Sequence, residues 1–340
     1  MKEVLLIIFQ HLDLKSINNC AALCSTFYNI SKDGSLYTKV SLRYDMNIKL
    51  VASLVERCTR PKEVDIIYKT SNAFITNNSA ETEDYSEFNE YVQILLRKCG
   101  EHIIKLNFES CKDSKTLECI ADCINLKELG LARCKGTFTT LHLLSSLREI
   151  KFVDCHFPGK TVNSLLKNNE ELKEIHLLSN NNVNTNEISE ILSKYNPEVE
   201  ELELGENRRL KSRYFKLLAR LTKLRTLEIW NGPGCDSDPD LDSIQHLAAG
   251  CPYMEKLVLM GRKEITDENL IPALHMFTRL KTLCLRGVGI TIKSCREACL
   301  TLPLLKELDV YKCSKIKKAQ DPRPKSISMF SPDLLQAVLG

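Results

Sequence analysis

The sequence predicts an α/β solenoid whose parallel strands line a concave face, preceded by a short all-α module. Three observations predict this fold. An apolar phrase recurs through most of the 340 residues, and cysteine or asparagine recurs at a fixed place after it. The N-terminal residues lack the phrase, but their apolar side chains fall at helical spacing.

The recurring phrase reads apolar-x-x-apolar-x-apolar. A weak copy begins at Pro61, and nine clear copies begin at Ile103, Leu126, Leu147, Leu172, Val199, Leu224, Met254, Leu280 and Leu305. The clear copies start 21 to 30 residues apart, close to the period of leucine-rich repeats. Alternation within a copy predicts a strand with one buried face, and the residues between copies supply a helix, as in Ser189 to Tyr195. One unit cannot bury its apolar face alone, so we expect the units to stack.

The cysteines support the same repeat. Six copies carry cysteine or asparagine eight residues after their start, the turn position of leucine-rich repeats: Cys111, Cys134, Cys155, Asn180, Asn207 and Cys313. The chain has fifteen cysteines, an odd number, and no two stand at C-x-x-C spacing. We therefore expect reduced thiols that pack as small apolar groups in an intracellular protein, with a disulfide framework as the alternative.

Composition excludes several classes of function. The 47 basic and 44 acidic residues leave a net charge of +3, so we expect no nucleic-acid partner. The longest apolar run, Val4 to Phe9, is six residues long and cannot span a bilayer, so we expect no membrane partner. The run Asp236 to Asp242 resembles a calcium loop but has Leu241 at its sixth position and Leu247 at its twelfth. No enzyme motif occurs, so we expect no catalytic residue, no cofactor and no metal.

The N-terminal residues resemble an F-box. The matching positions are Glu3, Ile8-Phe9, Leu12, Leu14, Leu23-Cys24, Phe27, Asp33 and Leu36-Tyr37. The order of an F-box and then cysteine-type repeats resembles the F-box/leucine-rich-repeat family. We expect an F-box-like helical module at 1–45, about ten repeats at 46–313, and a basic tail with a capping helix at 314–340. Met1 stands where F-boxes carry proline, which predicts that the module is truncated at its N-terminus.

This resemblance implies a function without catalysis. F-boxes of this family dock the Skp adaptor, and through it the cullin and RING subunits of an SCF-type ubiquitin ligase, while the repeats hold a protein substrate for proteasomal degradation in the cytoplasm or nucleus. Carried over residue by residue, the adaptor-facing positions are Leu5, Ile8, Phe9, Leu12, Leu14 and Ile17. An alternative assignment has half of these packing inward on the repeats. The rival functions are a repeat scaffold outside any ligase and a regulator of the GTPase-activating type.

The strand columns predict where a substrate binds. Because side chains alternate along a strand, the second, fourth and sixth positions after each start point to the concave face. These columns place there the acidic Glu201, Glu203 and Glu228 and the stripe Trp230, Met260, Arg286 and Tyr311. Trp, Tyr and Arg are enriched in binding hot spots. Two alternatives stay open: Lys127, Arg148, Lys173 and Arg225 neutralise the acids, or the C-terminal tail folds back over the stripe.

Overall fold

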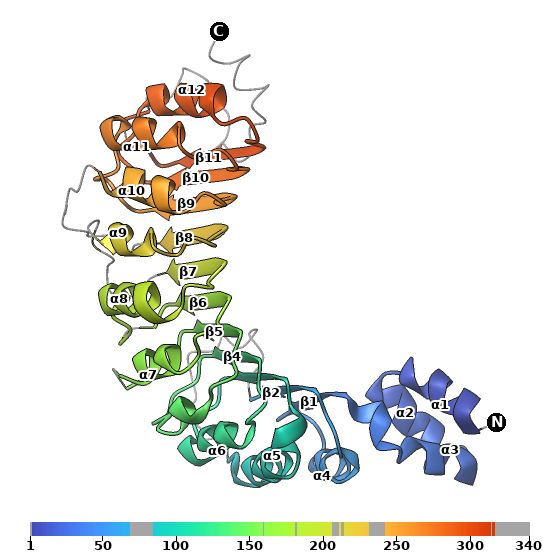
Figure 1. Cartoon of the computed structure of the whole chain (residues 1–340). Coiled ribbons are helices and arrows are strands. Elements are labelled where there is room, and N and C mark those ends of the chain that lie inside the picture. Colours follow the sequence, from blue (N-terminus) through green and yellow to red (C-terminus); the bar gives the residue numbers. More distant parts are fainter. Residues whose placement is uncertain are drawn as a thin grey trace, which may run out of the picture. The chain divides into compact units, whose positions relative to one another are not determined.

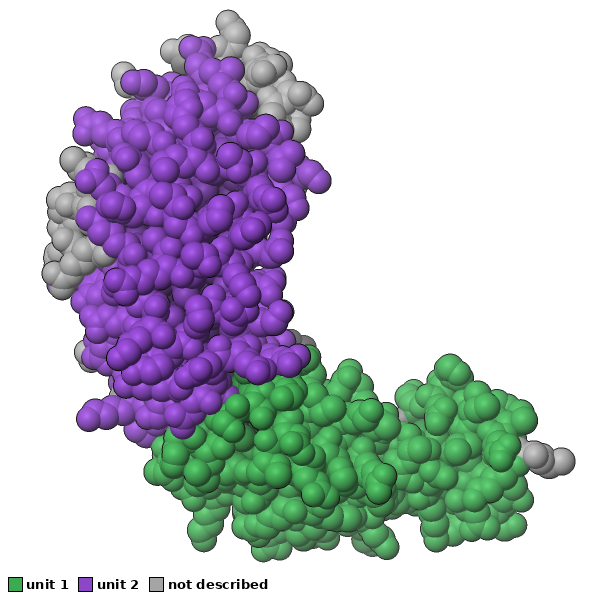
Figure 2. All heavy atoms as spheres, viewed as in Figure 1, with its two compact units in different colours: residues 1–147 green, residues 148–340 purple. Residues whose placement is uncertain are grey.

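The computed structural model describes residues 2–68, 84–158, 160–180, 182–205, 211, 214–230, 242–313, 315 and 316. It describes neither the side chains of Leu14 and Lys15, nor Asn207, the run 236–241, or the tail beyond residue 316. Most of residues 70–84, a polar stretch for which the sequence predicts a loop, also lies outside the described residues. The chain divides into two compact units, residues 1–147 and 148–340, which Figure 2 shows in green and purple.

Unit 1 begins with four short helices: α1 (Lys2–Gln10), α2 (Leu14–Ala21), α3 (Ser25–Ser31) and η1 (Gly34–Tyr37). Asp13 is the N-cap of α2, because its carboxylate accepts a hydrogen bond of 2.7 Å from the backbone N–H of Ser16. Helix α2 ends at Ala21, and Cys24, whose backbone is extended (φ −160°, ψ 164°), is the N-cap of α3.

Repeats follow in the rest of unit 1. Their elements are β1 (Lys39–Arg43), α4 (Ile48–Arg57), β2 (Glu63–Ile67), α5 (Ser86–Cys99), η3 (Gly100–His102), β3 (Lys105–Glu109), α6 (Ser114–Glu118), η4 (Cys119–Asp122), β4 (Glu128–Ala132) and η5 (Leu141–Leu143). The four strands pair in parallel and in chain order. Strand β1 falls within the range that we expected to be wholly helical, so the first repeat begins earlier than predicted. Tyr37, Val40 and Leu42 fill the three apolar places of the phrase, and all three are buried.

Unit 2 continues the alternation of strand and helix. Its elements are β5 (Glu149–Val153), α7 (Thr161–Lys167), β6 (Glu174–Leu178), α8 (Thr185–Tyr195), β7 (Glu201–Gly205), α9 (Phe215–Leu218), β8 (Thr226–Trp230), α10 (Ser243–Gly250), β9 (Lys256–Met260), α11 (Asp267–Leu274), β10 (Thr282–Arg286), α12 (Ile292–Thr301) and β11 (Glu307–Tyr311). The seven strands pair in parallel and in chain order. Figure 1 shows the helices stacked along one side of these strands. The fold is a leucine-rich-repeat solenoid.

The core of unit 2 is a ladder of apolar side chains. The second and fourth residues of strands β5 to β10 are buried, as the phrase predicted. The second-place residues Leu202, Leu227, Leu257 and Leu283 are all 0% exposed. Full burial of such a side chain contributes about 1.5–3 kcal/mol relative to leaving it exposed. The first, third and fifth residues of each strand are therefore directed to the opposite side, which we call the strand face.

A left-handed residue leads out of most strands that have a described exit. Ser110, Arg133, Asp154, Ser179 and Lys312 have φ between 53° and 62°, and Gly261 and Gly287 take the same place in two other repeats. The next residue is the buried turn position. Asn180 there donates from Nδ2 to the carbonyl of Phe152 (2.9 Å) and accepts from the backbone N–H of Cys155 (2.9 Å). The asparagine thus hydrogen-bonds the backbone groups of the preceding repeat.

Cysteine takes the turn position in four described repeats. Cys111, Cys134, Cys155 and Cys313 are buried there. The Cys313 thiol lies 3.3 Å from the carbonyl oxygen of Leu285, so it contacts the previous repeat as Asn180 does. Burial raises the pKa of Cys111 to about 11.

None of the described helices combines the length and apolar character that crossing a bilayer requires.

Candidate binding surfaces

Helix α1 has two apolar faces. One face packs into a small core of its own domain, formed by Phe9, Ile17 and Ile30, with Leu5 and Leu12 partly buried against it. The other face presents Val4, Ile7 and Ile8, which are 61%, 57% and 51% exposed. Their spacing of three and four residues puts them on one side of the helix. Leu23, in the turn between α2 and α3, is 72% exposed. Exposed apolar residues that are contiguous on one helix face are typical of a contact surface.

The strand face of unit 2 is ordered by the register of its strands. The fifth residues of consecutive strands are direct partners in the order Leu178, Gly205, Trp230, Met260, Arg286 and Tyr311. A Cβ atom at Gly205 would lie 2.5 Å from Leu178 Cδ2 and 3.2 Å from Trp230 Cε3. The missing side chain therefore lets the leucine and the indole approach each other across β7. We call the row Leu178, Trp230, Met260 and Tyr311 the apolar stripe.

The third residues of the strands form a neighbouring column. Its acids contact a histidine at a third place, a lysine at a first place and an arginine at a fifth place. His176 Nδ1 lies 2.8 Å from Glu203 Oε2, Lys256 forms an ion pair with Glu228, and the guanidinium of Arg286 donates from Nε to Asp309 (2.8 Å). The hydrogen bond to Glu203 raises the pKa of His176 above its usual value. The hydrogen bond to Glu228 likewise raises the pKa of Lys256. Between the charged pairs, Val258 and Cys284 are only 5% and 8% exposed.

A separate row of charges runs along the residues that precede the strands. Glu200 contacts Lys173 (2.9 Å) and Arg225 (3.5 Å). Arg225 continues to Glu255 (3.1 Å), which also pairs with Lys281. These cations therefore pair with Glu200 and Glu255 rather than with the strand-face acids, and Arg148 pairs with Glu171 (3.5 Å). The alternative that such cations neutralise the strand-face acids is not supported for Arg148, Lys173 or Arg225.

Residues 2–43 match the F-box-like family model. The helical domain is F-box-like. A comparison of the sequence with curated proteins found no match. Among solved structures, an internalin of Listeria monocytogenes is 15% identical with a TM-score of 0.47, covering 82% of this chain and 78% of its own. A leucine-rich-repeat protein of Leptospira interrogans is 16% identical with a TM-score of 0.49, covering 88% of this chain and 69% of its own. The repeat fold stated above rests on the strand order and register.

The burial of residues in the F-box-like domain corrects part of the predicted adaptor site. Of the six predicted residues, Ile8 is on the exposed face of α1, and Leu5 and Leu12 are partly buried. The prediction is wrong for Phe9 and Ile17, because they are 2% and 1% exposed in the core of the domain. They pack with one another and with Ile30 rather than on the repeats, so the alternative assignment is also wrong for these two. The side chain of Leu14 lies outside the described residues.

The exposed apolar residues of α1 that the sequence prediction omitted are Val4 and Ile7. With Ile8 they follow helical spacing on the outer face, as Leu5, Phe9 and Leu12 do on the inner face, so the apolar pattern marks two faces at once. Helical periodicity alone did not show which face packs inward. The burial of Phe9 decides it.

The strand face brings the predicted substrate residues together. Trp230, Met260, Arg286 and Tyr311 are register neighbours, as the columns predicted, and all are partly exposed. Glu203 and Glu228 occupy adjacent third places, with Glu201 beside Glu203. The register adds Leu178 and Val258, which the sequence analysis omitted. Aligning the copies by their starts gives the same columns and could have found both.

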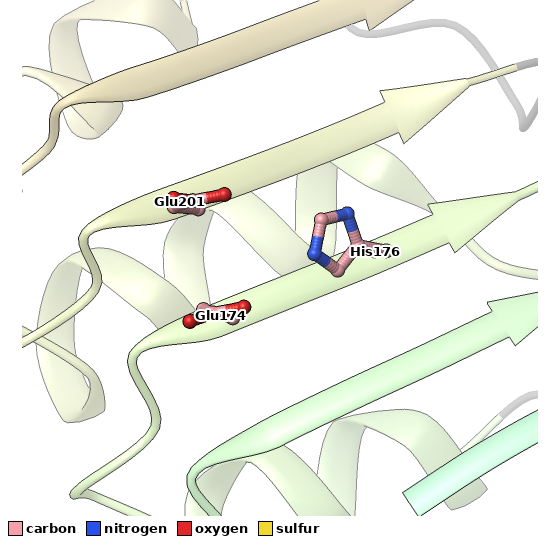
Figure 3. A group of neighbouring side chains, drawn as sticks. All are labelled: Glu174, His176 and Glu201. Carbon is pink, nitrogen blue, oxygen red and sulfur yellow. The ribbon is translucent and has the colours of Figure 1, made fainter. Parts of the chain in front are cut away.

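A cluster of potential metal ligands, which the sequence analysis did not name, also lies on the strand face. Glu174 and His176 of β6 lie beside Glu201 of β7, and one ligand atom from each lies within 4.8 Å of the others (Figure 3). Neither Glu174 nor His176 was named as a candidate in the sequence analysis. The strand register could have revealed this cluster, since Glu174 is the partner of Glu201 and His176 is the partner of Glu203 on the adjacent strands β6 and β7.

Proposed function

We propose that this protein is the substrate-recognition subunit of an SCF-type ubiquitin ligase. The observation that carries the proposal is the F-box-like match at residues 2–43, joined on one chain to a leucine-rich-repeat solenoid. F-boxes of this kind bind a Skp-type adaptor, which connects them to the cullin and RING subunits. The repeats then hold a protein substrate for ubiquitin conjugation and proteasomal degradation in the cytoplasm or nucleus.

The adaptor contact that we propose is the exposed face of α1. Val4, Ile7 and Ile8 lie on it, and each would contribute about 1.5–3 kcal/mol if an adaptor buried it fully. Leu5, Phe9, Leu12 and Ile17 support this face from within, since they form or border the core on which α1 rests. Loss of a core residue would therefore weaken binding through unfolding, whereas loss of an outer residue would weaken the contact itself.

The substrate contact that we propose is the strand face around the apolar stripe. Trp230, Arg286 and Tyr311 supply residue types that are enriched in binding hot spots, and Met260 lies between Trp230 and Arg286 in the same row. Glu201, Glu203 and Glu228 lie beside them and favour a substrate segment that carries basic and apolar side chains. No residue of the chain needs to act in catalysis, because holding the substrate near the conjugating enzyme raises its effective concentration.

The adaptor contact is tested by co-purification. A variant with Ile7→Glu and Ile8→Glu should lose a Skp-type adaptor by at least tenfold while its circular dichroism and melting temperature stay unchanged. The matched control is Gln10→Glu, which adds a charge at another exposed position of α1 and should keep adaptor binding. Undiminished binding by the double variant would refute the contact. Failure of the unchanged protein to bind any adaptor would instead favour the scaffold function outside a ligase.

The substrate contact needs a separate experiment. Proteins that accumulate on the wild-type chain when the proteasome is inhibited should be lost with Trp230→Ala combined with Glu203→Lys and Glu228→Lys. Glu307→Lys, at the first place of β11, is the matched charge control. Capture that persists in the triple variant, accompanied by a lower melting temperature, would show that the stripe is structural.

A further inference from the structure

Four side chains form a two-by-two block on the strand face of unit 2. Glu174 and His176 stand at the first and third places of β6, and their register partners on β7 are Glu201 and Glu203. The ligand atoms of Glu174, His176 and Glu201 lie within 4.8 Å of one another. All three belong to regular strands, so the backbone fixes where each side chain starts.

The imidazole is oriented for a ligand on one side. Its Nδ1 lies 2.8 Å from Glu203 Oε2, so a neutral ring donates there and keeps an acceptor lone pair on Nε2. Figure 3 shows the other ring nitrogen on the side of Glu174 and Glu201. A histidine that binds a metal through one nitrogen and donates to a carboxylate through the other is the usual arrangement around bound zinc. Glu203 supplies that carboxylate here.

The two flanking carboxylates lack a compensating cation. In the described part of the chain, no ion pair reaches Glu174 or Glu201, whereas Glu200, Glu203, Glu228 and Glu255 each have one. Glu149, the register partner of Glu174, adds a third acid to the row, and the exposed Lys151 faces His176. A cation between Glu174 and Glu201 would offset the repulsion between their charges.

We propose that Glu174, His176 Nε2 and Glu201 form a binding site for a divalent transition metal, with Zn²⁺ as the fitting ion. One imidazole and two carboxylates suit zinc, whereas Mg²⁺ and Ca²⁺ prefer oxygen ligands alone. Ligand atoms around tetrahedral zinc with bonds of 2.0–2.1 Å lie about 3.3 Å apart. The two glutamates reach that spacing by side-chain rotation. Three protein ligands leave one position open to solvent, or to a donor group of a bound protein.

The test measures Zn²⁺ binding to the full-length chain by isothermal titration calorimetry. Thiols also bind zinc, so the background carries serine at Cys20, Cys24 and Cys299, which are not buried, and at Cys235, which lies outside the described residues. We expect one zinc per chain. His176→Ala and the double variant Glu174→Gln with Glu201→Gln should each weaken binding at least a hundredfold. Glu203→Gln should weaken it about 10–100-fold through the lost orientation of the ring.

Two matched controls make the outcome specific. His156→Ala removes an exposed histidine that follows β5, and Glu307→Gln neutralises a first-place acid on β11; both should leave zinc affinity within twofold of the background. No stoichiometric binding in the background, or equal affinity in the background and in His176→Ala, would overturn the proposal. The site rests on the geometry of β6 and β7 alone, so its failure would leave the adaptor contact untouched.

Discussion

The F-box-like domain and the strand face of unit 2 expose opposite kinds of surface. The helical domain buries three apolar residues fully and leaves Val4, Ile7, Ile8 and Leu23 more than half exposed. The strand face belongs to a unit with a continuous buried ladder, and it presents charged pairs beside a partly covered apolar stripe. A small domain with a thin core depends more on a partner, whereas a solenoid stacks its own partners along the chain.

The largest expected effect tests the thin core. Phe9→Ala should cost about 3–5 kcal/mol, because it removes a large buried aromatic side chain. The other two fully buried members of this core, Ile17 and Ile30, contribute only about 1.5–3 kcal/mol each. Hydrogen exchange should therefore accelerate in α1 to α3 and stay unchanged in β8. Ile8→Ala, at a position 51% exposed, is the control and should leave exchange unaltered. Equal protection of α1 to α3 in Phe9→Ala and wild type would contradict the comparison.

The ladder of unit 2 should respond almost as strongly. Leu227→Ala removes a fully buried side chain of β8 and should lower the free energy of unfolding by about 2–5 kcal/mol. Chemical denaturation of the full-length chain measures this loss. Leu304→Ala removes a side chain that is 47% exposed in unit 2 and should change the same quantity by less than about 0.5 kcal/mol. Similar losses in both variants would show that the ladder does not dominate stability.

Loss of the hydrogen bonds between Asp267 of α11 and the N-terminal end of α12 should lower the free energy of unfolding by an intermediate amount that depends on pH. Asp267, in the first turn of α11, accepts hydrogen bonds from the backbone N–H of Thr291 (2.9 Å), the Thr291 hydroxyl (2.6 Å) and the Ser294 hydroxyl. Burial alone would raise its pKa, but these hydrogen bonds outweigh burial and lower it below the usual 3.8. Asp267→Ala should cost about 1–3 kcal/mol at neutral pH.

The sign of that pH dependence follows from linkage. A carboxyl whose pKa is lower in the folded state stabilises the fold fully above its unfolded pKa, and the contribution falls as the pH drops through the folded value. The difference in unfolding free energy between wild type and Asp267→Ala contains a part that depends on the charge of Asp267. This part should be constant above about pH 4 and decrease below it. Denaturation at several pH values measures it, and Glu268→Ala in the same helix turn is the control. A difference that first decreased between pH 8 and 5 would be incompatible with this assignment.

The smallest expected effect concerns the row of charges before the strands. Glu255→Gln breaks contacts with Arg225 and Lys281, which are partly exposed, so it should cost only about 0.2–1 kcal/mol. The cost should decrease further in 1 M salt, because salt screens exposed charges. Thermal denaturation at low and high salt checks both statements. A loss as large as that of Leu227→Ala would mean that charge pairing, rather than burial, stabilises the solenoid.

Sequence periodicity predicted the repeats well because it reports burial directly. Leu126, Leu129 and Leu131 gave a strand with one buried face, and β4 has that pattern. The first repeat was missed because Tyr37 had been assigned to the F-box and was not considered as the start of a phrase. The same residue closes the helical module and begins β1, so the two patterns overlap there.

Contacts between strands were harder to predict than the strands themselves. The stripe from Trp230 to Tyr311 followed from position numbers, because parallel strands in register align equal places. The side chain with which an acid pairs depends on rotamers, so the pairing of Glu203 with His176 and of Glu228 with Lys256 was not predicted. On α1 the difficulty was different. Six of its nine residues are apolar, so periodicity could not choose its inner face until Phe9 was seen to be buried.

The left-handed residues at the strand exits imply an unused reserve of stability. Two exits carry glycine, which takes this conformation without steric cost, yet Ser110, Arg133, Asp154, Ser179 and Lys312 adopt it with a side chain present. Each such residue carries a penalty of about 1–2 kcal/mol, which glycine would relieve in part, since glycine also has more freedom to lose on folding. These five described exits therefore keep a local conformational cost that the fold tolerates because the energy of the buried ladder exceeds it.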